Sequence, residues 1–418
     1  MISSHPAALA CATHPKRERV AVCGRCGNGV CHDCLTHTGV GIKCRTCTGE
    51  KAPAAAARRR PRWLVPAAVG GAVALGAVAA VLALGGGGSG SGDTASDLPG
   101  IDQSVSDVPV ERKLVLAGGG GTRIGATVGI PGGADKPVAA VLIVPGYGAI
   151  DRDAVMATTT PDGSADRLSQ DLNYSRPGSP DNLFRDLHSA ALGRRMATLR
   201  YDKRGSAESR LDASQALSYD DLVADAKAGL DALAQRRELE GVPLAVIGVD
   251  QGGLVAMRLA ASDPRVRAVV LVSSFGRPLA DVVGDDFIAA RGDTGREVSA
   301  QLHAVAEALA AGRPVPAPGD ISGHLRPLLP ATQERYLRAV FGLEPLAEAR
   351  AVRQPALLVR GERDTSTTAV DHERLRGALT GPTEELEFAG GDHNLGERGR
   401  RDADTMARLT SWLVTHIR

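Results

Sequence analysis

Apolar runs recur along the C-terminal part of the chain and limit its fold class. Val138–Val144 (VAAVLIV) is continuously apolar, as expected of a strand buried on both faces of a parallel sheet, and it ends in Pro145-Gly146-Tyr147-Gly148. Comparable runs follow at Met196–Arg200, Leu244–Val249, Ala268–Ser273 and Ala356–Arg360. Helical patterns such as Asp220–Leu239 lie between them, which is typical of βαβ crossovers. The sequence therefore predicts an α/β domain with a doubly wound, mostly parallel sheet.

A sharp turn is predicted where Leu244–Val249 meets the helical pattern QGGLVAMRLAA. The turn reads Gly248-Val249-Asp250-Gln251-Gly252-Gly253. Glycines on both sides of Asp250 permit the tight strand-to-helix turn known as a nucleophile elbow. Asp250 occupies the position of the nucleophile.

The region after Val108 resembles the α/β-hydrolase superfamily. LRYDKRG (Leu199–Gly205), GYGAIDRDA (Gly146–Ala154) and GERD (Gly361–Asp364) are similar to a bacterial branch that includes serine aminopeptidase-like and dienelactone hydrolase-like members. The resemblance implies an α/β-hydrolase fold with a helical lid. A lid fits residues 275–352, where the pattern becomes helical and is punctuated by Pro and Gly.

The resemblance also implies a triad of Asp250, Asp364 and His393. Asp364 follows the strand Ala356–Arg360, and His393 lies in GGDHNL after the strand-like EELEF. A carboxylate fixes the tautomer of the imidazole, and the imidazole moves protons. Backbone N–H groups of Tyr147 and Gln251 are the expected oxyanion-hole donors. Taken singly, an Asp after a strand is commonly a turn residue, and a His in a loop is commonly solvated. Asp202 and Asp392 are weaker candidates for the acid of the triad.

An Asp at the elbow leaves the reaction open. Carboxylate nucleophiles occur in the haloalkane dehalogenase and epoxide hydrolase branches, where histidine-activated water hydrolyses an ester intermediate. Those branches usually place Trp after the Asp. Here Gln251 follows, and the two tryptophans are Trp63 and Trp412, although Tyr336 is available from the lid region. We expect a hydrolase that acts on a small-molecule ester, lactone, amide or epoxide-type substrate. The alternative is a catalytically inactive binding or sensory ectodomain.

All seven cysteines lie between Cys11 and Cys47, in closely spaced pairs. The pairs are Cys11/His14, Cys23/Cys26, Cys31/Cys34 and Cys44/Cys47. Two-residue gaps let both side chains of a pair bind one ion, and thiolate and imidazole suit structural zinc. The alternative to zinc binding is that these cysteines form disulfides or a redox site. His32 and His37 are further imidazoles that we expect to be solvated or to support a ligand.

This segment resembles a B-box-type zinc finger, especially the short form at the N-terminus of some bacterial membrane proteins, including rhomboid-type proteases. The resemblance implies two structural zinc ions held by cross-braced ligands. The first ion would take Cys11, His14, Cys31 and Cys34, and the second Cys23, Cys26, Cys44 and Cys47. Such a closed site would stabilise the fold or bind a protein, and we expect no cofactor in the hydrolase-like domain.

Trp63–Leu84 contains no charged residue and, as a helix, would reach roughly 30 Å, the thickness of a bilayer core. A buried core helix or a linker is the alternative. Arg58, Arg59, Arg60 and Arg62 precede the segment, and the positive-inside tendency then places the N-terminus in the cytoplasm and the C-terminal domain outside. We therefore expect a single-pass protein of the cell membrane.

Changes of composition give the domain boundaries. They are a zinc module at 1–50, a basic juxtamembrane segment at 51–62, a transmembrane helix at 63–84, a Gly/Ser-rich flexible linker at 85–107 and the hydrolase-like domain at 108–418. The formal net charge is only +1, so the chain lacks the basic character that attracts nucleic acid. The expected partners are a small-molecule substrate and a cytoplasmic protein bound by the zinc module.

Overall fold

The computed structural model describes residues 21–22, 29–30, 34–38, 41–44, 108–133, 135–148, 150–154, 182–211, 217–396, 401 and 403–417. The chain divides into two compact units, Met1–Ser96 and Asp97–Arg418.

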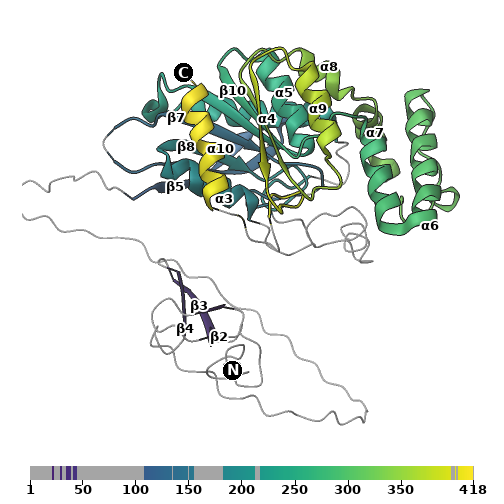
Figure 1. Ribbon diagram of the computed structural model, residues 1–418, viewed down its shortest axis with the longest axis horizontal. Helices are drawn as coiled ribbons and strands as arrows, with labels where there is room; N and C mark the ends of the chain where they lie inside the picture. The colour runs from purple at the N-terminus through teal and green to yellow at the C-terminus, as the bar shows by residue number, and fades with distance from the viewer. Residues whose placement is uncertain are drawn as a thin grey trace, which may run out of the picture. The chain divides into compact units, whose positions relative to one another are not determined.

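The larger unit is built on an eight-stranded sheet with the order β12-β11-β10-β9-β7-β8-β6-β5 (Figure 1). The strands are β5 (Val110–Ala117), β6 (Arg123–Ile130), β7 (Ala139–Val144), β8 (Met196–Tyr201), β9 (Leu244–Val249), β10 (Val266–Val272), β11 (Ala356–Gly361) and β12 (Thr383–Phe388). β6 is antiparallel to both β5 and β8, and the remaining pairs are parallel. This order and these directions are those of the α/β-hydrolase fold, so the predicted mostly parallel sheet is confirmed.

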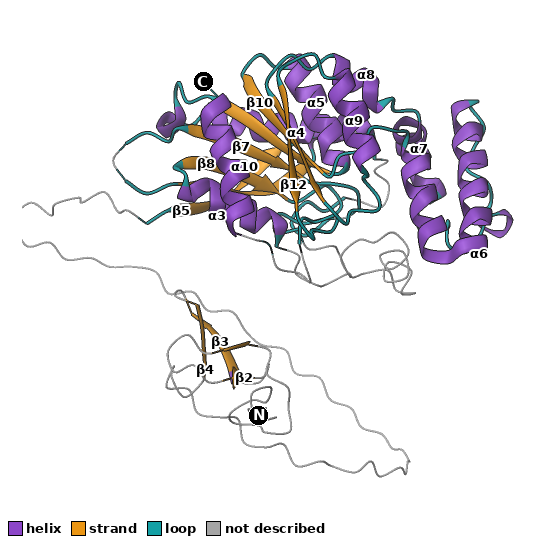
Figure 2. Cartoon of the chain, viewed as in Figure 1, coloured by secondary structure: helices purple, strands orange, loops and turns teal. Residues whose placement is uncertain are grey.

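Helices cover both faces of the sheet (Figure 2). They are α3 (Leu183–Gly193), α4 (Tyr219–Ala234), α5 (Gln251–Ser262), α6 (Leu279–Ala310), α7 (Glu334–Phe341), α8 (Pro345–Arg350), α9 (Ala369–Ala378) and α10 (Ala403–His416). Alternate residues of β7 point into separate cores: Leu142 packs with α4 and α5, whereas Val141 packs with α3 and α10. This two-sided burial explains the continuous apolar run of β7.

The segment between β10 and β11 holds α6, α7 and α8, in the region where the sequence predicts a lid. α6 is kinked at Gly292, whose φ of 57° favours glycine. α7 packs against α6 and also contacts α4. α6 also contains Asp286, which accepts a hydrogen bond from Ser366 in the loop after β11.

The smaller unit contains two antiparallel strand pairs. β1 (Ala21–Val22) pairs with β2 (Gly29–Val30), and β3 (Leu35–Thr38) pairs with β4 (Gly41–Cys44). In the part of the chain that the structure describes, no helix has the length and apolar character to cross a bilayer. The segment Trp63–Leu84 lies outside the described residues.

Candidate active site

Asp250 lies at a strained turn between β9 and α5. Its φ of 51° and ψ of −121° are unfavourable for a residue with a side chain, at a cost of about 1–3 kcal/mol. A Cβ atom at Gly248 would lie 2.3 Å from the carbonyl oxygen of Gly252, so only glycine fits there. The predicted elbow therefore exists, and it holds a side chain that is 5% exposed.

The carboxylate of Asp250 is bound by the loop that follows β7. The backbone N–H of Tyr147 donates a hydrogen bond of 2.8 Å to Asp250 Oδ2. Gly146 permits this approach, because a Cβ there would lie 2.9 Å from both Cβ and Oδ2 of Asp250. Burial raises the pKa of Asp250, although His393, the Tyr147 N–H and Lys203 act in the opposite direction. One predicted oxyanion donor is thus already engaged by the elbow side chain.

His393 and Asp364 form a buried pair. Nδ1 of His393 lies 3.1 Å and 3.0 Å from the two carboxylate oxygens of Asp364. Backbone N–H groups of Ser366 and Thr367 donate to Asp364 Oδ1 at 3.0 Å, which fixes the carboxylate. Burial raises the pKa of Asp364, but His393 and these hydrogen bonds outweigh it and the pKa falls below its usual range.

Three carboxylates act electrostatically on the imidazole of His393. Burial lowers its pKa, but Asp364, Asp250 and Asp286 together raise it to about 10. His393 is therefore an imidazolium at neutral pH in the resting site. The structure brings the predicted Asp250, Asp364 and His393 into one electrostatically coupled cluster.

A lysine that the sequence did not single out supports the Tyr147 loop. Lys203 Nζ donates to the carbonyl oxygen of Gly146 at 2.6 Å and to Oε1 of Gln251 at 3.0 Å. Burial lowers the pKa of Lys203 to about 8 despite the attraction of Asp250. The side chain of Gln251 also contacts the hydroxyl of Tyr336, 2.9 Å from Nε2 and 3.0 Å from Oε1. Helix α7, in the predicted lid region, is thereby hydrogen-bonded to the elbow.

Asp286, on α6, is a further buried carboxyl that sequence reasoning missed. Ser366 Oγ donates a hydrogen bond of 2.7 Å to Asp286 Oδ1. Oδ2 is buried and has no hydrogen-bond partner among the residues that the structure describes. Burial raises the pKa of Asp286 to about 7, against the influence of Ser366 and His393. Nothing in the pattern GDDF distinguishes this residue from an exposed helix acid.

Asp202, the weaker candidate acid, belongs to a structural ion pair. Arg152 Nη2 lies 2.6 Å from Asp202 Oδ2, and Arg152 Nε donates to Asp202 Oδ1 at 2.8 Å. Both side chains are buried, and the pair joins the loop after β7 to the loop after β8. Asp392 accepts backbone N–H groups of Asn394 and Gly396 within its own turn.

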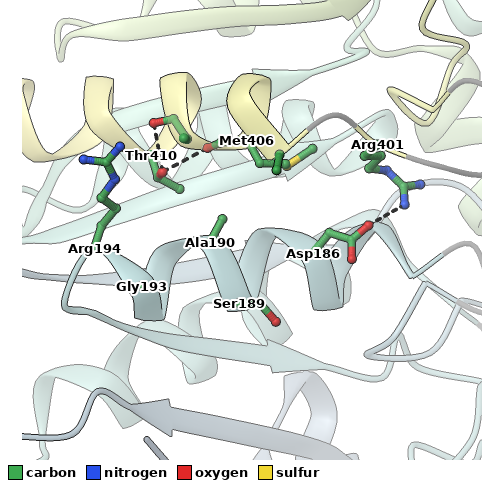
Figure 3. A pocket seen from close by; sticks show the side chains of 10 residues that line it. Asp186, Ser189, Ala190, Gly193, Arg194, Arg401, Met406 and Thr410 are labelled. Carbon is green, nitrogen blue, oxygen red and sulfur yellow. Dashed lines mark hydrogen bonds and ion pairs between the residues drawn. The ribbon is translucent and has the colours of Figure 1, made fainter. Parts of the chain in front are cut away.

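A pocket of about 450 Å³ lies between α3 and α10 (Figure 3). Arg401 Nη1 forms an ion pair of 2.8 Å with Asp186 at its rim. None of the predicted triad or oxyanion residues lines this pocket, so it is separate from the candidate active site. Of the predicted zinc ligands, the structure describes the side chain of Cys34, which is buried, and the side chains of the others lie outside the described residues.

The strand order, the elbow and the His393–Asp364 pair define an α/β-hydrolase-type domain. Residues 182–311, which include Asp250, match the family model for serine aminopeptidase, S33. This match supports the prediction that the domain is a hydrolase. Asp364 and His393 lie beyond the matched residues.

Solved structures also resemble this chain at low identity. A hypothetical protein from Pseudomonas aeruginosa is 19% identical with a TM-score of 0.48, over 77% of this chain and 98% of that one. A dienelactone hydrolase from Anabaena variabilis is 16% identical with a TM-score of 0.43, over 74% and 100% respectively. An esterase domain from Rhodothermus marinus is 15% identical with a TM-score of 0.44, over 74% and 100%. No curated protein sequence matches the chain significantly.

Proposed function

We propose that residues 108–418 form a hydrolase in which Asp250 attacks a saturated carbon of a small, epoxide-type substrate. The observation that carries this proposal is the hydrogen bond from the Tyr147 N–H to Asp250 Oδ2. In acyl transfer, an oxyanion donor must reach an oxygen of the substrate. Here the donor binds an oxygen of the nucleophile, which suits a different reaction.

The reaction has two steps. In the first, Asp250 Oδ1 forms a bond to a ring carbon, the carbon–oxygen bond breaks and the freed oxygen takes a proton. Asp250 is then an alkyl ester whose carbonyl oxygen, Oδ2, stays on the Tyr147 N–H. In the second step, water attacks the ester carbon, negative charge develops on Oδ2 and the same N–H stabilises it. The product is a diol and Asp250 is regenerated.

Attack on an ester or amide is less suited to this geometry. Asp250 would form an anhydride, and the substrate oxygen would have to displace Asp250 Oδ2 from Tyr147. The buried Tyr336 hydroxyl, hydrogen-bonded to Gln251 beside the elbow, supports the epoxide reading, because a lid hydroxyl can bind the ring oxygen. Esters, lactones and amides are therefore secondary substrate classes.

The test is a substrate panel combined with an intermediate trap. Full-length protein in detergent would be assayed on epoxides, esters, lactones and amides, as wild type, Asp250→Ala and Asp250→Ser. His393→Asn removes the base that activates water, so after reaction with an epoxide it should carry the full mass of that epoxide on the peptide containing Asp250. A wild type that is inert on every substrate, combined with an active Asp250→Ser, would instead establish a silenced serine hydrolase.

For the N-terminal unit we propose a B-box-like zinc module, anchored by a membrane span at 63–84, that recruits a cytoplasmic protein. The donor set supports zinc, because thiolates and imidazole are its preferred ligands. The strands fit as well: Cys23 and Cys26 lie in the sequence between β1 and β2, whereas Cys34 and Cys44 bound the β3–β4 pair. Zinc analysis of the purified protein tests the metal, and protease accessibility on intact cells tests the placement of the hydrolase domain outside.

A further inference from the structure

The candidate active site contains one more carboxyl group than the two-step reaction uses. Asp250 is the nucleophile and Asp364 orients His393, which leaves Asp286 without a role. Asp286 is 3% exposed, so its burial is as complete as that of His393. An unused buried carboxyl is expensive unless it is protonated or paired.

The hydrogen bond that Asp286 accepts indicates which of its two oxygens carries the proton. Ser366 Oγ donates to Oδ1, so Oδ1 acts as an acceptor. Oδ2 has no partner among the described residues and is the oxygen that can carry a hydrogen. Ser366 also donates its backbone N–H to Asp364, which links Asp286 to the loop that orients His393.

The surroundings of Asp286 favour exchange of a proton with the catalytic cluster. His393, Asp364 and Asp250 all act on its carboxyl electrostatically. The adjacent Asp285 on α6 instead pairs with Arg277, which also binds Asp371. The charged groups that act on Asp286 are thus those of the candidate active site.

We propose that Asp286 is the general acid of this site, which protonates the oxygen freed when Asp250 opens the ring and afterwards takes a proton from His393. The inference rests on the proposed function. In the proposed resting state, Asp286 and His393 are protonated, and Asp250 is an ionised carboxylate that the Tyr147 N–H and the positive charge of His393 stabilise against burial. Ring opening consumes the Asp286 proton and leaves an Asp250 ester, an Asp286 carboxylate and an imidazolium.

The second proton transfer makes His393 a base. An imidazolium cannot accept a proton from water, so His393 must first lose one. The new Asp286 carboxylate accepts it, which restores protonated Asp286 and gives neutral imidazole. His393 then removes a proton from water as hydroxide attacks the ester. The ester C–O bond then breaks, and the departing alkoxide takes the proton of the attacking hydroxide, which gives the diol. Asp250 is released as carboxylate, and all three residues return to their starting states.

Two measurements on full-length protein test this role. The first needs no turnover: NMR titration of ¹⁵N-labelled imidazoles in wild type, Asp286→Asn and Asp285→Asn. Asp286→Asn should lower the pKa of His393, because it removes a negative charge from its surroundings, and Asp285→Asn should not. An unchanged His393 titration in Asp286→Asn would overturn the proposal.

The second measurement is the rate of Asp250 ester formation from styrene oxide, by rapid quench across pH. In wild type the rate should fall as pH rises through about 7, where Asp286 loses its proton. Asp286→Asn should be slower by about 100-fold or more at pH 6, with that descending limb absent. A structural role would lower the rate at every pH and keep the limb, which would contradict the proposal. Absence of ester in wild type would refute the proposed function, and the imidazole titration would still decide whether Asp286 and His393 share protons.

Discussion

The backbone N–H of Tyr147 lies 2.8 Å from Oδ2 of Asp250, so a predicted oxyanion donor binds the elbow side chain itself. Three features hold the contact: the glycine at 146, the positive φ of Asp250 and the bond from Lys203 to the Gly146 carbonyl. The Tyr147–Asp250 contact therefore depends on the backbone conformation as well as on the rotamer of Asp250.

Asp250→Ser should exchange one activity for another. The shorter side chain leaves the Tyr147 N–H for a substrate carbonyl oxygen, and loss of a carboxylate lowers the pKa of His393 toward a useful base. Hydrolysis of an activated aryl ester should then rise, with the freed donor contributing about 10²–10³ in rate. Epoxide opening should disappear. Steady-state assays of both substrates check this, and an Asp250→Ser variant that still opens epoxides would show that Asp250 is not the nucleophile.

Asp364→Asn should block ester hydrolysis more than ester formation. An amide can favour the wrong imidazole tautomer, and the analogous loss in a serine protease triad is about 10⁴-fold. The Asp250 ester should therefore accumulate and be visible by intact mass. Asp392→Asn is the matched control, because among the described residues the Asp392 carboxylate accepts N–H groups of its own turn. An equal loss of ester hydrolysis in both variants would mean that the substitutions disturb the loops after β11 and β12 in general. Asp364 would then have no special role.

The buried pair of Arg152 and Asp202 should be a main support of the two loops beneath the site. Arg152→Ala leaves Asp202 buried without its partner, and such a change typically costs about 3–5 kcal/mol of unfolding free energy. Arg185→Ala is the control, since its side chain is 58% exposed and its pairing with Asp153 is long, at 4.0 Å. Urea unfolding should separate the two variants clearly. Similar midpoints would show that the pair contributes little.

The parts of the site that depend on residues close together in the chain could be predicted from the sequence. β7 and β9 are apolar on both faces because helices cover both faces, and the glycines around Asp250 are required by a turn only a few residues long. The strands and the turn depend on short-range geometry. Asp364 and His393 each follow a strand of the sheet, and the resemblance to the α/β-hydrolase superfamily implied that they belong to one site.

The remaining residues depend on contacts between distant elements. Asp286 is 80 residues from Ser366 in the chain, and their hydrogen bond joins α6 to the loop after β11. Lys203 lies in the motif LRYDKRG, which carries the family resemblance but gives this lysine no role, yet its Nζ donates to Gln251 and to the Gly146 carbonyl. In the sequence both residues resemble charged residues exposed to solvent, because their neighbours in the chain do not indicate that they are buried.

The proposed zinc module gives a prediction that is independent of the hydrolase domain. Full-length protein should contain two zinc ions per chain by elemental analysis. Cys34→Ser should remove the first ion, because a tetrahedral structural site needs all four ligands. His32→Ala is the control and should retain both. Loss of zinc in His32→Ala would show that the predicted ligand set is wrong.

Asp286 should make the stability of the fold depend on pH. Its pKa rises from 3.8 to about 7 on folding, so the native state binds more protons between these values and the free energy of unfolding falls as pH rises through that window. The loss is complete above pH 7 and amounts to at most about 4 kcal/mol. Asp286→Asn removes this titration, so it should be more stable than wild type at pH 8, by less than that amount, with the advantage shrinking toward pH 4. Asp285→Asn, whose side chain is 54% exposed in wild type, should show no such trend. Urea unfolding at a series of pH values measures the difference, and a gap between Asp286→Asn and wild type that stays constant with pH would mean that Asp286 does not titrate in this window.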